Sequence, residues 1–327
     1  MPIAETNVDT QQQPPPGAGL PAYVVFGEGA LASIGATVVS NPFEVMKTRL
    51  QLQGELMKQG SYHRKYNGMV SGMAKVASQE GLTALQKGLW ASMIHQLVQN
   101  GIRFGTYPYF KEYFRTMNNN EPGLKVNLLS GCSAGLIGAV VSNPLMMVKT
   151  RLQSSSKPNI LGPDQSVVGH QHHYKGVFDG LRQIVAEGGV KGLWFGVKPA
   201  MYRTVTLSSM QLATYDGVKE LSVTKLGLSE FDVRVHFIAG AASAFAVMVA
   251  MNPLDVILTR SHNNGSQHIK AKSTSVPGIM REIVAVEGVQ GLYKGSLALW
   301  SRLAPHFICT FILLEQLRNL RPTIWGI

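Results

Sequence analysis

Polar residues recur at helical spacing inside otherwise apolar stretches of this 327-residue chain. In residues 90–115 they lie mostly three or four positions apart, which places them on one face of a helix. Residues 198–221 and 297–319 repeat the pattern, and each stripe contains at least one arginine. The stripes comprise Ser92, His95, Gln96, Gln99, Asn100, Arg103, Thr106 and Tyr107 in the first, Arg203, Thr204, Ser208, Gln211 and Tyr215 in the second, and Arg302, His306 and Thr310 in the third.

The arginines of these stripes indicate a site for an anion. At membrane depth a guanidinium group is costly unless it lines water or meets an anion. We therefore expect the arginines, one from each stripe, to converge on a cavity and to bind an anion there. The alternative is that the arginines pair with protein carboxylates or extend to the membrane surface, although these segments contain few carboxylates.

Six apolar segments have the length of membrane-spanning helices, for which about 20 residues suffice. Charged residues make up 15% of the chain and hydrophobic residues 45%, whereas an average soluble domain is about 25% charged. The mean hydropathy of +0.06 is low for a bundle that faces lipid on all sides, so some helix faces must meet a wet cavity. The sequence thus predicts an all-α membrane protein with spans near 22–48, 90–115, 127–151, 198–221, 235–259 and 297–319.

An internal repeat organises these segments into three pairs. The pattern N-P-x-x-x-x-x-T-R occurs three times, about one hundred residues apart. Its prolines, Pro42, Pro144 and Pro253, lie inside the first segment of each copy, where a bundle tolerates a proline bend. We expect pseudo-threefold symmetry, short helices in the loops, and repeats at 22–120, 121–228 and 229–321, between a disordered tail at 1–21 and a C-terminal tail at 322–327.

Charge and targeting signals narrow the location. The net charge of +11 fits nucleic acid, anionic lipid or an anionic solute, and charge alone does not choose among them. Residues 1–20 contain no Lys or Arg, the opposite of an Arg-rich transit peptide, so we expect no cleavable presequence. If the protein is mitochondrial, its basic loops belong on the matrix side and both termini face the intermembrane space.

Cysteine and histidine usage gives no sign of a metal or cofactor. We expect Cys132 and Cys309 to be buried thiols, because they lie in apolar stretches without metal-ligand spacing. The group of His170, His172 and His173 is typical of a solvated polar loop. The chain also lacks a nucleophile–base pair and a phosphate-cradling glycine loop, so we expect no enzyme.

A soluble scaffold of helical repeats with a basic face for nucleic acid or protein is the alternative from another class. Repeats of about one hundred residues are much longer than solenoid units. The apolar faces that border the polar stripes also favour a membrane protein with no nucleic-acid partner.

The repeats resemble those of the mitochondrial carrier family from about residue 22 to residue 319, through the pattern P-x-[DE]-x-x-[KR], which the first copy matches in full and the other two in part. The resemblance implies a transporter whose matrix side is closed by ion pairs, here Glu44 with Lys149 and Asp255 with Lys47. Met146 stands where an acid belongs and Leu258 where its basic partner belongs. Replacing both members of a buried pair can be neutral, so we expect an apolar contact there.

The resemblance implies further sites on the second, fourth and sixth of the predicted membrane-spanning helices. Substrate contacts fall on His95 with Gln96, on Arg203 with Thr204, and on Arg302, with Arg103 lower in the cavity. The pattern [FY]-[DE]-x-x-[KR] implies a weaker cytoplasmic gate that leaves Lys219 without a partner. Its residues are Lys111, Asp216, Lys219, Glu315 and Arg318, and the implied cardiolipin sites lie at Gly68, Gly88, Gly176, Gly196, Gly278 and Gly295.

Several phrases, among them Asn100-Gly101-Ile102-Arg103-Phe104-Gly105 and Asp255-Val256-Ile257-Leu258-Thr259-Arg260, are similar to those of family members that carry oxaloacetate in fungi and their animal relatives. This similarity implies a monomeric carrier of oxaloacetate, and also of malonate, sulfate or isopropylmalate. A carrier of another dicarboxylate or inorganic anion is the alternative within the family.

Overall fold

The computed structural model describes residues 22–58, 64–119, 121, 123–156, 168–226, 233–264 and 275–320, and this part of the chain is built from helices. The expected tails at 1–21 and 322–327 lie outside the described residues. Six long helices occupy the six predicted segments, each extended by a few residues. They are α1 (Ala22–Leu52), α3 (Leu89–Met117), α4 (Leu124–Ser154), α7 (Val197–Leu226), α8 (Val233–Asn264) and α11 (Ser296–Asn319).

A short amphipathic helix connects the two long helices of each repeat, as expected. These helices are α2 (Met69–Glu80), α6 (Val177–Gly188) and α9 (Val276–Glu287), and each is followed by one tight turn, η1 (Leu82–Gln86), η3 (Val190–Trp194) or α10 (Val289–Leu292). The asparagine of each N-P motif donates to a carbonyl at the end of that turn. The three bonds are Asn41 to Leu85, 3.3 Å, Asn143 to Leu193, 2.8 Å, and Asn252 to Leu292, 2.9 Å.

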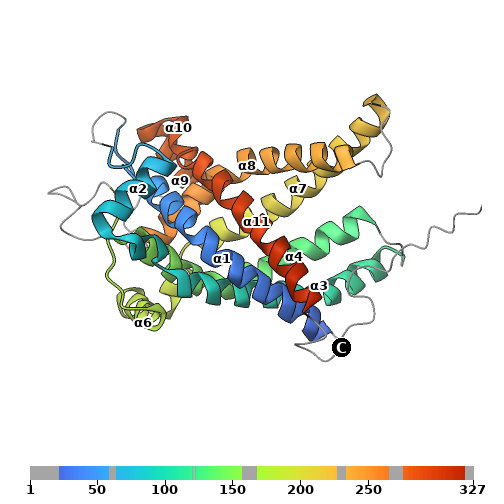
Figure 1. Cartoon of the computed structure of the whole chain (residues 1–327), viewed down its shortest axis with the longest axis horizontal. Helices are drawn as coiled ribbons and strands as arrows, with labels where there is room; N and C mark the ends of the chain where they lie inside the picture. The colour runs from blue at the N-terminus through green and yellow to red at the C-terminus, as the bar shows by residue number, and fades with distance from the viewer. Residues whose placement is uncertain are drawn as a thin grey trace, which may run out of the picture.

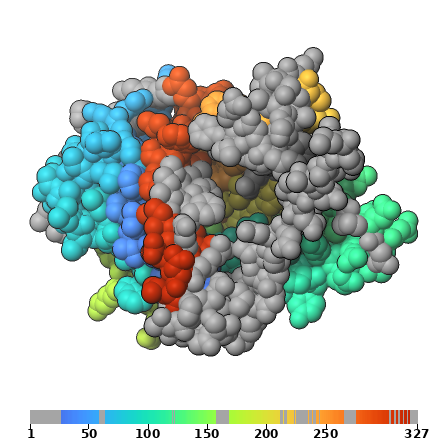
Figure 2. Space-filling model, turned by 45° about the vertical axis from the view of Figure 1, so that its right-hand side comes forward, coloured from blue at the N-terminus to red at the C-terminus, as the bar shows by residue number. Residues whose placement is uncertain are grey.

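The long helices form a closed ring in which the most extensive contacts join neighbouring repeats. Helix α3 packs on α4, α7 packs on α8, and α11 returns to pack on α1. In Figure 1 the short helices gather at the left, where α1, α4 and α8 end, and the pairs α3–α4 and α7–α8 diverge toward the right. We call the left end the closed end. Figure 2, with the right-hand side turned forward, shows the molecule hollowed at its centre.

Length and hydropathy alone identify one membrane-spanning candidate among the described helices, α4. The polar stripes lower the hydropathy of α3, α7 and α11, because helices that line a wet interior cannot be apolar all round. Six membrane spans therefore remain a prediction.

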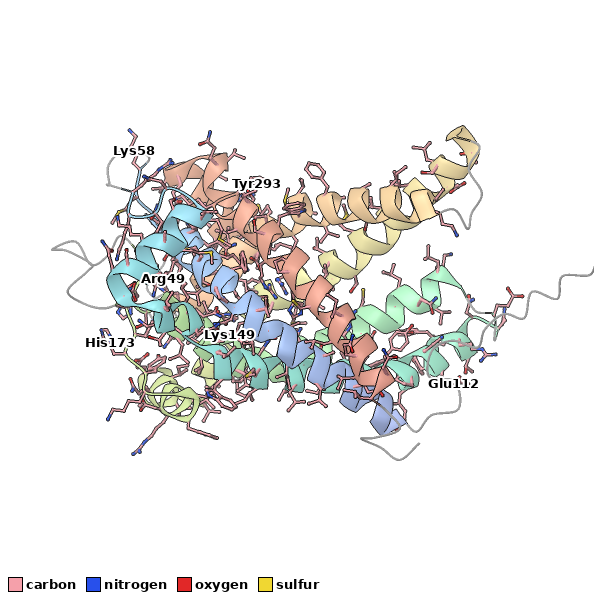
Figure 3. All side chains as sticks on the ribbon, viewed as in Figure 1. Arg49, Lys58, Glu112, Lys149, His173 and Tyr293 are labelled. Carbon is pink, nitrogen blue, oxygen red and sulfur yellow. The ribbon has the colours of Figure 1, made fainter. Side chains whose placement is uncertain are left out.

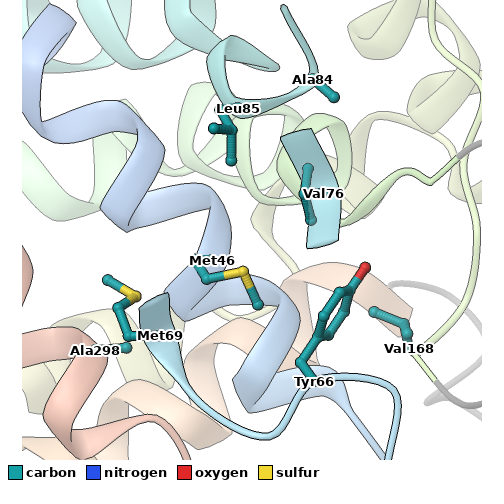
Figure 4. Close-up of a cluster of buried hydrophobic side chains, with 8 residues drawn as sticks. All are labelled: Met46, Tyr66, Met69, Val76, Ala84, Leu85, Val168 and Ala298. Atoms are coloured by element: carbon teal, nitrogen blue, oxygen red, sulfur yellow. The ribbon is translucent and has the colours of Figure 1, made fainter. Parts of the chain in front are cut away.

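The core near the closed end attaches each short helix to its repeat. In the first repeat Met46 of α1 packs against α2 and the loop before it, in the cluster of Figure 4. Gly72 of α2 permits this approach, because a Cβ there would lie 2.5 Å from Met46 Cε. The cluster comprises Met46, Tyr66, Met69, Val76, Ala84, Leu85, Val168 and Ala298.

Two expectations about individual residues have different outcomes. Pro42, Pro144 and Pro253 lie inside the continuous helices α1, α4 and α8, and a bend at each proline remains a prediction. The expectation of buried thiols is wrong, because Cys132 and Cys309 are both half-buried. A ring of helix pairs encloses fewer side chains away from its closed end than a globular core does.

Two glycines of α4 test this packing. Gly135 faces α7, and a Cβ there would lie 2.7 Å from Thr204 Cγ2, whereas a Cβ on Gly131 meets nothing within 4 Å. We expect Gly135→Ala to lower the melting temperature of the detergent-purified protein by overpacking, an effect of about 1–3 kcal/mol. Gly131→Ala, the matched control one turn away, should leave it unchanged or raise it, since alanine favours helix. Equal effects would contradict the packing of α4 on α7.

Candidate functional site

Two buried ion pairs join α1, α4 and α8 near the closed end. We call α1, α4 and α8 the odd helices, because they are the first, third and fifth of the six long helices, and α3, α7 and α11 the even helices. Lys149 Nζ of α4 lies 2.8 Å from Glu44 Oε1 of α1, and Lys47 of α1 pairs with Asp255 of α8. All four side chains are less than 10% exposed. These are the two pairings that the resemblance implied, and Figure 3 labels Lys149 in this position.

The arginines of the polar stripes join the same carboxylates. Arg203 Nε lies 3.0 Å from Asp255 Oδ1, and Arg302 Nε lies 3.4 Å from Glu44 Oε1. The alternative that these arginines pair with protein carboxylates therefore holds in this structure. Their side chains are 16% and 15% exposed, and the Nε of Arg302 is buried without a hydrogen bond, so its contact with Glu44 is an ion pair only. Each carboxylate is thus shared between a lysine of an odd helix and an arginine of an even helix.

The remaining residues of the predicted substrate site are arranged less uniformly. His95 is 4% exposed, and neither of its ring nitrogens has a hydrogen-bond partner. Gln96 is half-buried, and Arg103 is exposed. Thr204 donates its hydroxyl to the Ala200 carbonyl at 2.9 Å and turns its methyl group toward α4, so this hydroxyl is not presented to a ligand.

The predicted apolar replacement of the third ion pair is also present. Leu258 of α8 is 1% exposed and forms a cluster with Ala139 and Ala200. Met146 of α4 packs against this cluster. No charge is stranded at this position, in agreement with the paired loss of acid and base.

A layer of glutamines and threonines below the ion pairs was missed. Gln51 donates to Asp255 Oδ2 at 3.0 Å and accepts from the Thr259 hydroxyl at 2.8 Å. Gln153 accepts from the Thr48 hydroxyl at 3.3 Å. The recurrence of Gln two residues after the T-R of the first two repeats was the available signal.

A ring of three buried arginines lies in the same region. These are the arginines that end the repeated motif, and each donates its Nε–H to a carbonyl near the end of the next odd helix. The bonds run from Arg49 to Gln153, 3.3 Å, from Arg151 to His262, 3.0 Å, and from Arg260 to Gln51, 3.4 Å. The last carbonyls of a helix have no partner within it, so these bonds satisfy groups that would otherwise be buried unpaired.

Acids at the ends of the short helices neutralise these arginines unequally. Arg49, labelled in Figure 3, holds Glu80 through two bonds of 2.5 and 3.0 Å, and Lys87 adds a third contact at 3.2 Å. Arg260, Glu287 and Lys294 repeat the arrangement in the third repeat. In the second repeat Arg151 lies 3.3 Å from Glu187, whose side chain is 45% exposed, and Phe195 stands in place of the lysine.

The predicted cytoplasmic gate is described only in part. The side chains of Asp216, Glu315 and Arg318 lie outside the described residues, so their pairings remain predictions. Lys111 is exposed. The expectation that Lys219 is left unpaired is wrong, because Lys219 does interact with another residue.

The predicted lipid-binding glycines fall into two geometries. Gly88, Gly196 and Gly295 precede α3, α7 and α11 with φ of 72°, 79° and 76°, a left-handed conformation that favours glycine. Gly68 and Gly176 are extended and precede α2 and α6 without any side-chain cap.

Gly278 does not begin a helix and corrects the prediction. Helix α9 begins after Ser275, whose hydroxyl accepts the Gly278 N–H at 3.3 Å, with Pro277 in the first turn. A serine N-cap followed by proline is a strong helix start, and it places this start three residues earlier than predicted.

The histidine loop is only partly solvated. His170 and His173 are exposed, as expected, but His172 is 7% exposed and its Nε2 lies 2.7 Å from the Asn263 carbonyl. The interpretation as a wholly solvated loop is therefore wrong for His172. Among the described residues no group of three His, Cys, Asp or Glu side chains could hold a metal ion.

A ring of two-helix repeats, hollow at its centre and closed at one end by buried ion pairs, has the architecture of a solute transporter. Comparison with known proteins gives the family. A model described as "Mitochondrial carrier protein" matches residues 19–118, 121–226 and 229–323, so this chain belongs to the mitochondrial carrier family, whose members are transporters and not enzymes.

Relatives resemble the chain over most of its length. The mitochondrial oxaloacetate transport protein of Saccharomyces cerevisiae is 39% identical over 90% of this chain and 89% of its own length. Human solute carrier family 25 member 35 is 36% identical over 90% and 97%. Mitochondrial citrate transporter E of Aspergillus niger is 37% identical over 90% and 92%. The identities are too similar to determine the substrate.

The apolar contact between α4 and α8 gives a prediction about pairing. Met146→Asp alone should destabilise the closed end, because the new carboxylate is buried beside Leu258 without a partner, a cost of about 3–5 kcal/mol. Adding Leu258→Lys should recover much of the loss. Thermal stability and transport of the two single variants and the double variant form a double-mutant cycle. Simple additivity would show that the two positions do not meet.

A cavity at the closed end is lined in part by the carboxyl group of Glu55. It has a volume of about 640 Å³ and is lined by the loops after α1 and before α6 together with the end of α8. Half-buried Glu55 accepts a hydrogen bond from Asn264 Nδ2 at 2.7 Å. Burial raises the pKa of Glu55 to about 7, against the favourable field of Arg260, and nearby Glu287 adds to the increase.

The raised pKa of Glu55 predicts that the stability of the folded protein depends on pH. The pKa in the folded protein lies above the ordinary value of 4.5, so the folded state binds the proton more tightly than the unfolded chain. The contribution of Glu55 to stability is complete below about pH 4.5 and is lost as the pH rises through about 7. Melting temperatures in detergent should therefore fall less between pH 5 and pH 8 for Glu55→Gln than for the parent protein, by about the effect of one titrating group. Parallel curves would contradict this assignment.

Proposed function

We propose that this protein transports a small dicarboxylate anion, oxaloacetate first, across the mitochondrial inner membrane by alternating access. In this proposal the six long helices span the membrane, the closed end faces the matrix, and both termini face the intermembrane space. The relatives named for oxaloacetate and citrate transport support a carboxylate substrate. The observation that carries the proposal is the sharing of Asp255 and Glu44 with Arg203 and Arg302.

The shared carboxylates suggest how binding opens the closed end. A dicarboxylate that enters the hollow brings two carboxylates, which compete with Asp255 and Glu44 for the two arginines. Each guanidinium then exchanges one carboxylate for another, so its charge stays paired. Each gate carboxylate loses one of its cations, which weakens the contacts between the odd helices. Binding energy is thereby used to part the closed end, the differential interaction that a conformational change requires.

Further members of the substrate set follow from the same geometry. Malonate and isopropylmalate present two carboxylates, and sulfate presents paired oxygens that suit a guanidinium fork. The Aspergillus niger relative adds citrate to the anions that should be compared. The exposed Arg103 supplies an additional positive charge for which a third carboxylate would compete.

Cardiolipin binding to a monomeric carrier is part of this proposal. Helices α2 and α6 begin at Gly68 and Gly176 with no side-chain cap, so their first N–H groups are available to a phosphate. The left-handed Gly88, Gly196 and Gly295 begin the even helices beside them. Helix α9 differs, because the Ser275 hydroxyl already occupies one of its N–H groups.

Uptake by reconstituted liposomes tests the substrate and its two arginines. We expect labelled oxaloacetate to enter, and Arg203→Ala and Arg302→Ala each to lower the rate by roughly tenfold to a hundredfold, since a charge-assisted contact contributes about 1.5–3 kcal/mol. Arg182→Ala, which removes an equal charge from an exposed position on α6, is the control and should transport normally. Normal uptake by both stripe variants would refute the site, and a stronger signal from citrate or sulfate would change the substrate.

A further inference from the structure

The odd helices α1, α4 and α8 meet in three interfaces at the closed end, which we call seams. The first seam lies between α1 and α4, the second between α4 and α8, and the third between α8 and α1. The repeated motifs place equivalent residues at each seam. We call an ion pair or hydrogen bond across a seam a tie. A tie that is absent from one seam can therefore be recognised by comparison with the other two.

The first seam has a tie in each of three layers. Glu44 pairs with Lys149 at 2.8 Å in the ion-pair layer. The Thr48 hydroxyl donates to Gln153 Oε1 at 3.3 Å in the layer below. Lys87, the residue before the glycine that precedes α3, donates to the Ser155 carbonyl at 2.9 Å.

The third seam repeats all three ties. Lys47 pairs with Asp255, and the Thr259 hydroxyl donates to Gln51 Oε1 at 2.8 Å. Lys294, which corresponds to Lys87, donates to the Gln53 carbonyl at 3.1 Å.

The second seam lacks the corresponding tie in every layer. Met146 and Leu258 replace the ion pair with an apolar contact. The Thr150 hydroxyl donates to the Met146 carbonyl of its own helix, at 2.9 Å, and not across the seam. Phe195 stands where the other repeats have the lysine. The seam retains two other contacts. One is the bond from Arg151 to the His262 carbonyl, which has an equivalent in each of the other seams. The other joins His262 Nε2 to Asn143 Oδ1 at 3.1 Å and corresponds to the bond from Gln153 to Asn41 in the first seam.

A chain of hydrogen bonds through His172 also crosses the second seam and has no counterpart in the ties of the other two. Arg151 Nη1 lies 2.5 Å from the Tyr174 hydroxyl, which lies 3.3 Å from His172 Nδ1, and His172 Nε2 lies 2.7 Å from the Asn263 carbonyl. A carbonyl only accepts, so Nε2 carries the hydrogen and donates it across the seam. Nδ1 is then the acceptor for the Tyr174 hydroxyl, which accepts in turn from Arg151. Every donor in the chain therefore has an acceptor.

A second contact meets the same residue of α8. The Ser154 hydroxyl lies 2.9 Å from Asn263 Oδ1. Asn263 is thus held through both its backbone and its side chain by residues of the second repeat. In the first repeat the position equivalent to His172 is occupied by Arg64, which is exposed. The arrangement is therefore not a feature of every repeat.

We infer that His172 is a positioning residue of the transport cycle, which holds the second seam closed in place of the lysine and ion pair of the other two seams. The inference rests on the proposed function for the direction in which the closed end opens. Because this seam can part without stranding a buried charge, it is the first of the three to separate.

The tie made by His172 is insensitive to physiological pH. Burial, with Arg151 as the next cause, lowers the pKa of His172 to about 3. The ring is therefore neutral and keeps one donor and one acceptor. Glutamine presents the same pair of groups on a flexible side chain, whereas leucine presents neither.

Cysteine accessibility tests the inference without any substrate. A probe of Met146→Cys, in a protein whose Cys132 and Cys309 are replaced by serine, lies behind the second seam. An impermeant thiol reagent is added to the side that the closed end faces. Loss of one neutral hydrogen bond, about 1 kcal/mol, should raise the labelling rate in His172→Leu about fivefold. His172→Gln should label at the parent rate.

Two controls separate seam opening from general instability. His173→Leu makes the same substitution at the exposed neighbouring histidine and should leave labelling unchanged. A probe of Val76→Cys, buried in the core of Figure 4, reports global unfolding and should stay unlabelled in all variants. The inference fails if His172→Gln labels as fast as His172→Leu, if His172→Leu labels at the parent rate, or if both probes react together. These outcomes do not depend on which anion the protein transports.

Discussion

Burial of charge at the closed end is the constraint on which the rest of the structure depends. Each buried ion loses several kcal/mol of hydration, which is recovered only if it meets a partner in good geometry. Glu44, Lys47, Lys149 and Asp255 meet this condition only when α1, α4 and α8 are held at fixed spacing. The asparagine bonds to the short turns and the ring of motif arginines supply that spacing.

Much of this arrangement follows from the sequence because it is repeated in register. Three copies of one motif predict three equivalent elements, and the partners of Glu44 and Asp255 follow from the family pattern applied to those copies. The six long helices follow from the apolar segments, which each helix exceeds by a few residues. The apolar contact at Met146 was predictable for the same reason, since a paired loss leaves no charge behind.

Contacts that break the symmetry could not be predicted, because they depend on distances between elements far apart in the chain. The sequence predicted that Arg203 and Arg302 bind a substrate anion, whereas in the structure both pair with carboxylates of odd helices. Thr204 satisfies its hydroxyl within α7. His172 looked like part of a solvated loop, because its neighbours are polar, and only the position of Asn263 shows that it is buried.

The places where symmetry is lost also bear on how such a ring can open. Three independent substitutions of a threefold pattern would be expected at different seams if each were neutral on its own. They coincide at the seam between α4 and α8: Met146 and Leu258 in the ion-pair layer, His262 where the other repeats have glutamine, and Phe195 where they have lysine. Opening a seam with an ion pair separates charges in a poorly hydrated interior, and the first such separation is the most costly. A ring with one uncharged seam avoids that step, because hydration can enter there before the two ion pairs part.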